Sequence, residues 1–319
     1  MAGLDTAEPA LYPPLEPFAE QQLRVKGGHV LHVEQCGNPS GFPAIFLHGG
    51  PGSQTRALHR RFFDPRFYRI VLFDQRGCGR SVPLGRTEDN TTGHLVEDIE
   101  ALVSRLGLGR AMLFGGSWGA TLALAYAAAR PQRVAAMVLR GVFLGTRGEV
   151  DWYLGGLREL APQAWEALAQ GQGDGLLARY HALVSDGDKA AAQRWVAYEQ
   201  AIMALDSGAP GTREVEDPDA VLARARVQLH YLAHECFLQP GELVSGLARL
   251  AETPVLIVQG KRDLVCPPRA ALELAERLPH AELRLIERGG HSAAAPEMAQ
   301  ALRRATDDLR ARLRGLGTR

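Results

Sequence analysis

The chain has 319 residues, a length that fits one large α/β domain with an inserted subdomain. Lysine plus arginine and aspartate plus glutamate each number 36, so the formal net charge is zero, and no basic excess favours nucleic acid or a membrane surface. No apolar run approaches the length of a membrane span, and the proline-rich residues 1–24 lack the apolar core of a signal peptide or membrane anchor.

The first 145 residues alternate short apolar runs with a helical pattern. Leu95, Ile99 and Leu102 recur at helical spacing, which predicts a helix over residues 91–106. The apolar runs predict strands, and these are residues 22–33 (a hairpin turning at Gly27-Gly28), 44–47, 69–73, 112–114 and 134–139. Strands that alternate with helices in this way are typical of a parallel sheet covered on both faces.

The pattern changes after residue 145. Residues 146–250 show helical stretches rich in Ala, Leu, Trp and charged side chains, with no strand-like run. Strand patterns return at 254–260 and 281–286, and an amphipathic helix is expected over 296–314. We therefore expect an α/β fold whose core is interrupted by a helical cap. The predicted division is a first core part at 1–145, the cap at 146–250 and a second core part at 251–319.

The most informative local pattern is a Gly-x-Ser-x-Gly core centred on Ser117, placed between an apolar strand and a helical run of small residues. This is the strand, tight turn and helix of a nucleophile elbow. The turn requires small residues two positions before and after the serine, and Gly115 and Gly119 stand there. The Ser117 hydroxyl is then exposed at a helix N-terminus, where the Trp118 amide can donate to an oxyanion.

An attacking serine needs a base, and the base needs an acid that orients it. In elbow hydrolases these follow in the order Ser, Asp or Glu, His, each on a loop after a strand. Asp263 follows one late strand and His291 the next, so we expect Ser117, Asp263 and His291 to form a catalytic triad. Taken singly, Asp263 could be a helix cap and His291 an ordinary loop histidine; the ordered set of three favours the triad.

The second oxyanion donor is expected from the glycine-rich run 48–52, which follows the strand at 44–47. Glycines let backbone amides approach a carbonyl oxygen closely, and we expect Gly50 to donate beside Trp118. The alternative is a structural Gly-Pro turn without a catalytic role.

Four segments together resemble the prolyl iminopeptidase family of the α/β-hydrolase fold. These segments are His48-Gly49-Gly50-Pro51-Gly52, the run DQRGCGRS at 74–81, Gly115-Gly116-Ser117-Trp118-Gly119 and Gly290-His291-Ser292. The resemblance covers nearly the whole chain and is strongest outside the cap. It implies a serine aminopeptidase that releases N-terminal proline from short peptides through an acyl-enzyme, with no metal and no other cofactor.

The resemblance also implies a substrate pocket. Glu199 matches a family glutamate that binds the charged imino group, and Phe143 and Tyr153 match aromatic positions around the proline ring. Two positions depart from the family pattern, because Gln228 replaces a second glutamate and Leu232 replaces a phenylalanine. Glu199 could also be a solvated helix residue, and the aromatic side chains could be core packing.

Two rival functions stay open from the sequence. One is an α/β-hydrolase acting on small uncharged esters or amides, for which Gln228 and Leu232 would mark the change. The other is a non-catalytic ligand-binding protein on the same fold, which a complete triad argues against. The oligomeric state also stays open.

Two further patterns bear on cofactors and compartment. His230 and His234 have the spacing of a metal-binding helix face, but without a third spaced ligand we expect no metal site. The four cysteines form no Cys-x-x-Cys pair, which predicts a reduced, cytoplasmic chain without disulfides or zinc.

Overall fold

The computed structural model describes residues 10–207 and 217–315. Residues 1–9, which begin the proline-rich segment, lie outside this range, as do residues 208–216 and 316–319. Within the described ranges, no helix combines the length and the hydrophobicity that a bilayer crossing requires.

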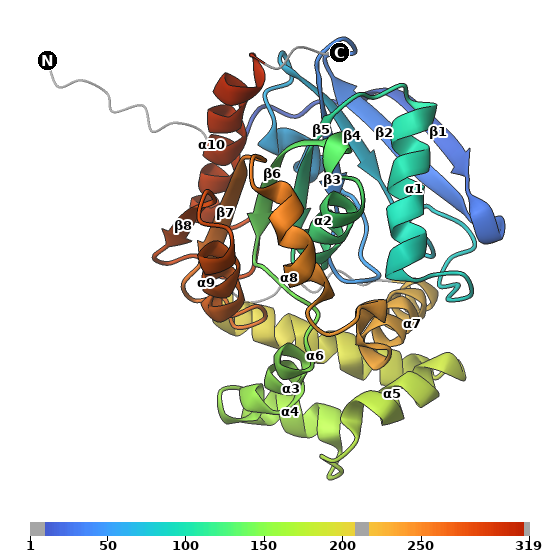
Figure 1. Ribbon diagram of the computed structural model, residues 1–319. Helices are drawn as coiled ribbons and strands as arrows, with labels where there is room; N and C mark the ends of the chain where they lie inside the picture. Colours follow the sequence, from blue (N-terminus) through green and yellow to red (C-terminus); the bar gives the residue numbers. More distant parts are fainter. Residues whose placement is uncertain (1–9, 208–216, 316–319) are drawn as a thin grey trace, which may run out of the picture.

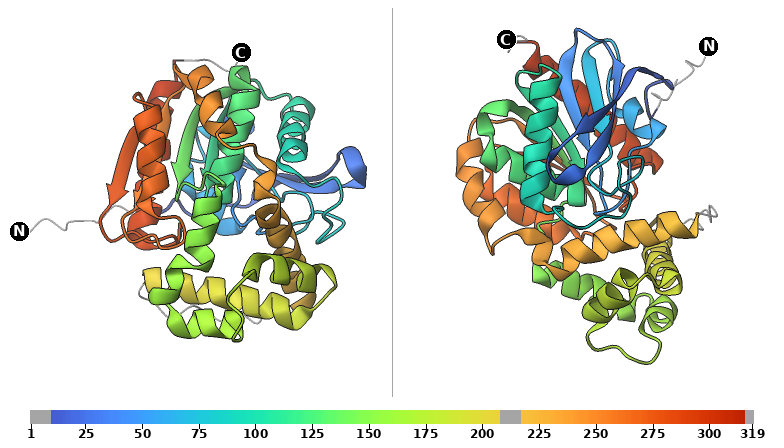
Figure 2. Two further views of the ribbon diagram at one scale, coloured as in Figure 1. Left: turned by 60° about the horizontal axis from the view of Figure 1, so that its bottom comes forward. Right: turned by 90° about the vertical axis from the view of Figure 1, so that its right-hand side faces the viewer.

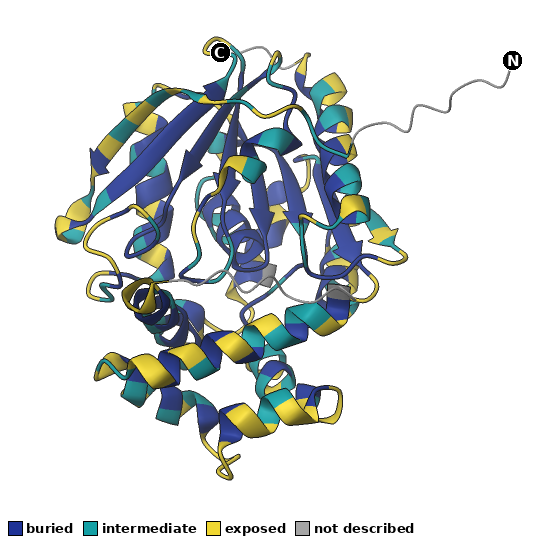
Figure 3. Ribbon diagram, turned by 180° about the vertical axis from the view of Figure 1, so that it is seen from behind, coloured by how far each residue is buried: buried dark blue, intermediate teal, exposed yellow. Residues whose placement is uncertain are grey.

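The core is an eight-stranded sheet in the order β1-β2-β4-β3-β5-β6-β7-β8 (Figure 1). The strands are β1 (Pro17–Arg24), β2 (Val30–Gly37), β3 (Phe42–Leu47), β4 (Tyr68–Phe73), β5 (Ala111–Gly116), β6 (Val134–Arg140), β7 (Val255–Gly260) and β8 (Glu282–Ile286). The pairs β1–β2 and β2–β4 are antiparallel, and every other pair is parallel. Because helices cover both faces, every residue of β3, β5 and β7 is buried (Figure 3).

Helices cover the sheet from both sides (Figure 1). One apolar cluster packs α1 (Thr92–Arg105), α2 (Trp118–Ala129) and α9 (Pro268–Arg277) on one face. A second cluster packs α10 (Pro296–Leu313) on the other face. This is the fold class expected from the alternating pattern, and all catalytic loops expected from the sequence leave the carboxyl ends of its parallel strands.

A layer of helices lies across that end of the sheet (Figures 1 and 2). It comprises α3 (Arg147–Leu154), α4 (Pro162–Ala169), α5 (Leu176–Ser185), α6 (Lys189–Ser207) and α7 (Pro218–Ala233). Thr146 and Glu149 form a reciprocal capping box that starts α3 directly after the core. Helix α8 (Glu242–Gly246) instead packs on α2, so the last residues of the segment expected as cap lie with the core.

The first two strands extend beyond the hairpin expected at 22–33. The alternating apolar pattern of β2 stops at Val33, because the next two residues, Glu34 and Gln35, are polar. Both are nevertheless buried. They remain in the strand because Arg60 bonds the Glu34 carboxylate and Arg69 bonds the Gln35 amide oxygen. Burial of paired polar groups explains why hydrophobic periodicity underestimates this strand.

Candidate active site

Ser117 stands between β5 and α2 with φ 57° and ψ −127°, a strained backbone conformation for a residue with a side chain. The neighbouring chain leaves no room for larger residues around it. A Cβ at Gly115 would lie 2.1 Å from the Gly119 carbonyl oxygen, and a Cβ at Gly119 would lie 2.1 Å from the Leu47 carbonyl oxygen. The two glycines therefore allow the turn that presents Ser117 at the start of α2.

The loop after β3 lies against this turn. A Cβ at Gly49 would be 3.3 Å from the Ser117 Cβ, and Gly50 has φ 114°, which favours glycine. Both Gly50 and Ser117 line the same cavity, with Trp118 as the first residue of α2. The arrangement brings the two expected oxyanion donors, Gly50 and Trp118, to the region around the serine.

Gln75 ties the loop and the elbow helix together. Its side-chain amide donates to the His48 carbonyl oxygen over 2.9 Å, and its oxygen accepts from the Trp118 indole over 2.9 Å. The Gln75 backbone N–H donates to His48 Nε2. Burial lowers the pKa of His48, so this imidazole is a neutral structural group rather than a second base.

Asp263 and His291 meet at the carboxyl ends of β7 and β8. His291 Nδ1 lies 2.8 Å from Asp263 Oδ2 and 3.0 Å from Oδ1. The carboxylate also accepts the Cys266 backbone N–H over 2.7 Å, and the Gln259 amide lies 3.5 Å away. With Asp263 2% exposed, this geometry holds the imidazole with its proton on Nδ1 and Nε2 free to act as a base.

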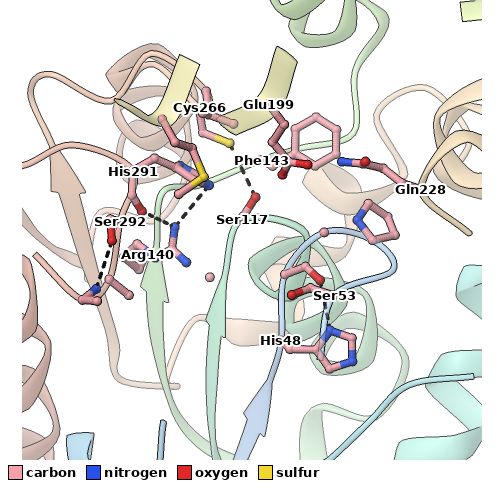
Figure 4. Close-up of a pocket in the computed structure, with 18 of the residues that line it drawn as sticks. His48, Ser53, Ser117, Arg140, Phe143, Glu199, Gln228, Cys266, His291 and Ser292 are labelled. Carbon is pink, nitrogen blue, oxygen red and sulfur yellow. Dashed lines mark hydrogen bonds between the residues drawn. The ribbon is translucent and has the colours of Figure 1, made fainter. Parts of the chain in front are cut away.

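Ser117 and His291 line one cavity but are not joined by a hydrogen bond in this conformation. The polar contact of Ser117 Oγ is with Cys266 Sγ at 3.9 Å (Figure 4). Burial raises the pKa of the Cys266 thiol well above its usual range, so the neutral thiol faces the serine. Catalytic hydrogen bonds of this kind are often long in the free enzyme and shorten when substrate binds.

Arg140, at the end of β6, is a neighbour of the expected triad that was not predicted from the sequence. Its guanidinium donates to the His291 carbonyl oxygen over 2.8 Å and lies 3.4 Å from Nε2 (Figure 4). A Cβ at Gly116 would collide with this guanidinium at 2.5 Å. Burial lowers the pKa of Arg140, and the charges of Asp263 and Asp206 oppose that effect.

Asp206, near the end of the cap helix α6, is a second missed residue. The His291 backbone N–H donates to the Asp206 carboxylate, with its nitrogen 2.8 Å from Oδ1 and 2.6 Å from Oδ2. The Leu264 backbone N–H donates to Oδ2 over 3.4 Å. A Cβ at Gly290 would lie 1.4 Å from Asp206 Oδ1, so the loop approaches the carboxylate as closely as glycine allows. Through this carboxylate, the cap fixes the backbone of the loop that carries the expected base.

We expect Asp206→Ala to lower kcat by about 10- to 100-fold with KM unchanged, because small misplacements of a catalytic group carry penalties of this size. Asp206 does not line the substrate cavity, so binding should persist. Asp206→Asn retains one oxygen acceptor and should lose less activity. Steady-state kinetics on all three proteins measure the effect.

The matched control for this prediction is Asp188→Ala. Asp188 Oδ1 accepts the Ala191 N–H at the other end of α6, so its loss costs about 1 kcal/mol of stability without touching His291. A similar kcat loss in Asp188→Ala would mean that α6 stability, rather than the Asp206 contact, governs the rate.

The cavity between the cap and the elbow has a volume of about 700 Å³ and is lined by all four expected substrate residues. Figure 4 labels three of them, Phe143, Glu199 and Gln228. Glu199 comes from α6, Gln228 from α7, Phe143 from the loop after β6 and Tyr153 from α3. Two carboxylates line the cavity, and Glu149 already accepts the Leu144 and Thr146 backbone N–H groups. Together with Glu199, the apolar walls beside the nucleophile can hold a small cationic group next to a reacting carbonyl.

Tyr153 contributes both an aromatic wall and a polar group. Its ring packs edge-on against Tyr198 at 5.3 Å and Trp195 at 6.4 Å. Its hydroxyl is buried without a hydrogen-bond partner among the described residues. Burial, followed by the charge of Glu199, raises the Tyr153 pKa well above 10, which keeps the hydroxyl protonated. A neutral donor is thus available beside Glu199.

Gln228 already has a partner inside the cap. Its side-chain oxygen accepts the Trp195 indole N–H over 2.7 Å. A carbonyl oxygen has two acceptor sites, so one remains for a ligand. Gln228 carries no charge, so on this part of the wall the carboxylate comes from Glu199, which lies on the same helix as Trp195.

Comparison with known proteins agrees with the fold. Residues 43–296 match the family described as "alpha/beta hydrolase fold". A protein of Xanthomonas citri named "Proline iminopeptidase" is 43% identical over 307 residues, which cover 93% of this chain and 98% of that protein. One of the same name from Arabidopsis thaliana is 40% identical over 312 residues, covering 94% and 82%.

Among solved structures, the chain resembles 2-hydroxy-6-oxo-6-phenylhexa-2,4-dienoate hydrolase from a Rhodococcus species. The TM-score is 0.59 at 21% identity, and the match covers 93% of this chain and 99% of that one. At this identity the likeness concerns the fold alone.

Proposed function

The chain belongs to the proline iminopeptidase family of α/β-hydrolases, and from that premise we propose that it releases N-terminal proline from short peptides. The observation that carries this proposal is a carboxylate, Glu199, that shares one largely apolar cavity with Ser117 and His291. A charged imino group needs such a partner, and the proline ring needs apolar walls such as Phe143 and Tyr153.

The proposed reaction proceeds through an acyl-enzyme. His291 Nε2 takes the proton of Ser117 as its oxygen attacks the prolyl carbonyl, and the Gly50 and Trp118 amides stabilise the oxyanion. The imidazolium then protonates the departing amine, which leaves proline esterified to Ser117. Water, deprotonated by His291, hydrolyses that ester and restores the serine. Asp263 orients the imidazole throughout.

Recognition of the imino group depends on Glu199 in this proposal. A hydrogen bond to a charged group is worth about 1.5–3 kcal/mol, or roughly 10- to 150-fold in kcat/KM. We expect Glu199→Gln to lower kcat/KM by this factor for a prolyl arylamide. For an uncharged acyl ester, we expect kcat/KM to change far less. Comparing kcat/KM for the prolyl arylamide, its N-acetylated form and the ester, on both proteins, measures the effect.

Preference of the wild type for the free prolyl substrate over the N-acetylated form supports the aminopeptidase. Equal cleavage of blocked amide and ester, unaffected by Glu199→Gln, supports the second candidate, an esterase or amidase for uncharged substrates. Gln228 and Leu232 favour that candidate, because both depart from the family pattern on the cavity wall.

We further propose that the enzyme acts in the cytoplasm. The four cysteines are buried and unpaired, which fits a reducing compartment. Fractionation of the native cells, with the activity followed by prolyl arylamide cleavage, tests this proposal.

A further inference from the structure

Three histidines meet where two cap helices pack together, and none of the three lines the catalytic cavity. His181 comes from α5, His230 from α7, and His234 directly follows α7. One ring nitrogen from each lies within 4.8 Å of the others. His181 supplies the third ligand that the spacing of His230 and His234 lacked in the sequence. Helices α5 and α7 pack side by side here (Figure 1).

Hydrogen bonds already fix the tautomers of two of these rings. His230 Nε2 lies 3.0 Å from the Asn90 carbonyl oxygen, so Nε2 carries the proton and Nδ1 keeps its lone pair. His234 Nδ1 lies 2.7 Å from the His230 carbonyl oxygen, so its Nε2 keeps the lone pair. Histidines that bind metals usually donate their other N–H to a carbonyl or carboxylate in this way.

Aromatic packing surrounds the cluster. Phe237 stacks on the face of His234 with ring planes 9° apart, and His181 meets His234 edge-on at 88°. The stack with Phe237 uses a face of the His234 ring, whereas coordination uses a lone pair in the ring plane.

We propose that His181, His230 and His234 bind one Zn²⁺ ion, with water completing its coordination. Imidazole nitrogen suits zinc and related transition metals, whereas calcium and magnesium prefer oxygen ligands. Zinc at about 2.0–2.1 Å from each nitrogen places the nitrogens roughly 3.4 Å apart in a tetrahedral site. The half-buried His181 and the exposed His234 can close that difference by small side-chain rotations.

The site would clamp α5 to α7. Helix α7 carries Gln228 and Leu232 on the wall of the catalytic cavity, and His230 also bonds the core at Asn90. A metal here therefore joins two cap helices and the core at one point. Its effect is on the stability of the cap, and it takes no part in the proposed reaction.

The test is Zn²⁺ titration by calorimetry on untagged, chelator-treated protein, followed by Co²⁺ absorption spectroscopy. We expect one Zn²⁺ per chain and a visible Co²⁺ spectrum of low coordination symmetry. His181→Ala should weaken Zn²⁺ binding by at least the roughly 10- to 100-fold typical for loss of a supporting group around a metal. His280→Ala, which removes one exposed histidine outside the cluster, is the matched control.

Thermal unfolding gives an independent readout. Zn²⁺ should raise the Tm of wild type and of His280→Ala, and raise that of His181→Ala and of His234→Ala much less. Equal zinc affinity in wild type and His181→Ala would overturn the proposal, since it would locate the ion elsewhere, for example at Cys266 and His291. Absence of stoichiometric binding would equally overturn it and leave the cluster as aromatic packing.

Discussion

Replacing Ser117 with alanine is expected to lower kcat for a prolyl arylamide by about 10⁶-fold, the size of effect seen when a triad nucleophile is removed. The elbow should survive the change, because alanine has the same Cβ and meets the same neighbours at φ 57°. Substrate binding should also survive, since Glu199, Phe143 and Tyr153 are untouched. Calorimetry with a prolyl peptide on the inactive variant then gives the dissociation constant directly.

Ser292 provides the matched control. It lines the same cavity next to His291, but its hydroxyl accepts the Ala294 backbone N–H within its own turn. Ser292→Ala should keep nearly full activity and still react with a serine-directed phosphonate, whereas Ser117→Ala should not. Phosphonate labelling of Ser117→Ala would place the nucleophile at another residue and contradict the proposed mechanism.

The local parts of the site could be predicted from the sequence, because their signals are short-range. Gly115, Ser117 and Gly119 lie within five positions, and the steric demands of the elbow act between neighbours. The fold class could also be predicted from short-range patterns. Parallel strands that are buried on both faces, such as β5 and β7, appear in the sequence as continuous apolar runs.

The missed residues act over long sequence separations. Asp206 contacts a backbone nitrogen 85 residues away, and nothing in a helix-terminal aspartate indicates which amide it will accept. Arg140 ends a buried strand, where only the packing of Gly116 and His291 shows its role. The proposed zinc ligands show the same limit. Spacing along the chain indicates His230 and His234, whereas His181 comes from another helix and joins them only through packing.

Replacing Asp263 with asparagine is expected to lower kcat by about 10⁴-fold while the fold is retained. The reason is that two N–H donors would compete for one acceptor oxygen. The carboxylate accepts from His291 Nδ1 and from the Cys266 N–H at once, and asparagine has a single oxygen for the two. If that oxygen faces Cys266, the amide NH₂ meets His291 and favours the tautomer with its proton on Nε2. That tautomer cannot take the proton of Ser117.

The two ways in which this variant could lose activity are separable. A wrong tautomer lowers kcat and the rate of phosphonate labelling together, while KM and Tm stay close to wild type, because Glu199 and the buried loop are unchanged. A displaced loop would also raise KM and lower Tm. Activity within tenfold of wild type would show that the Asp206 and Arg140 contacts to the His291 backbone orient the imidazole without Asp263. The contacts to the His291 backbone hold the main chain, and Asp263 is the group that accepts the ring proton at Nδ1, so Asp263 sets the tautomer.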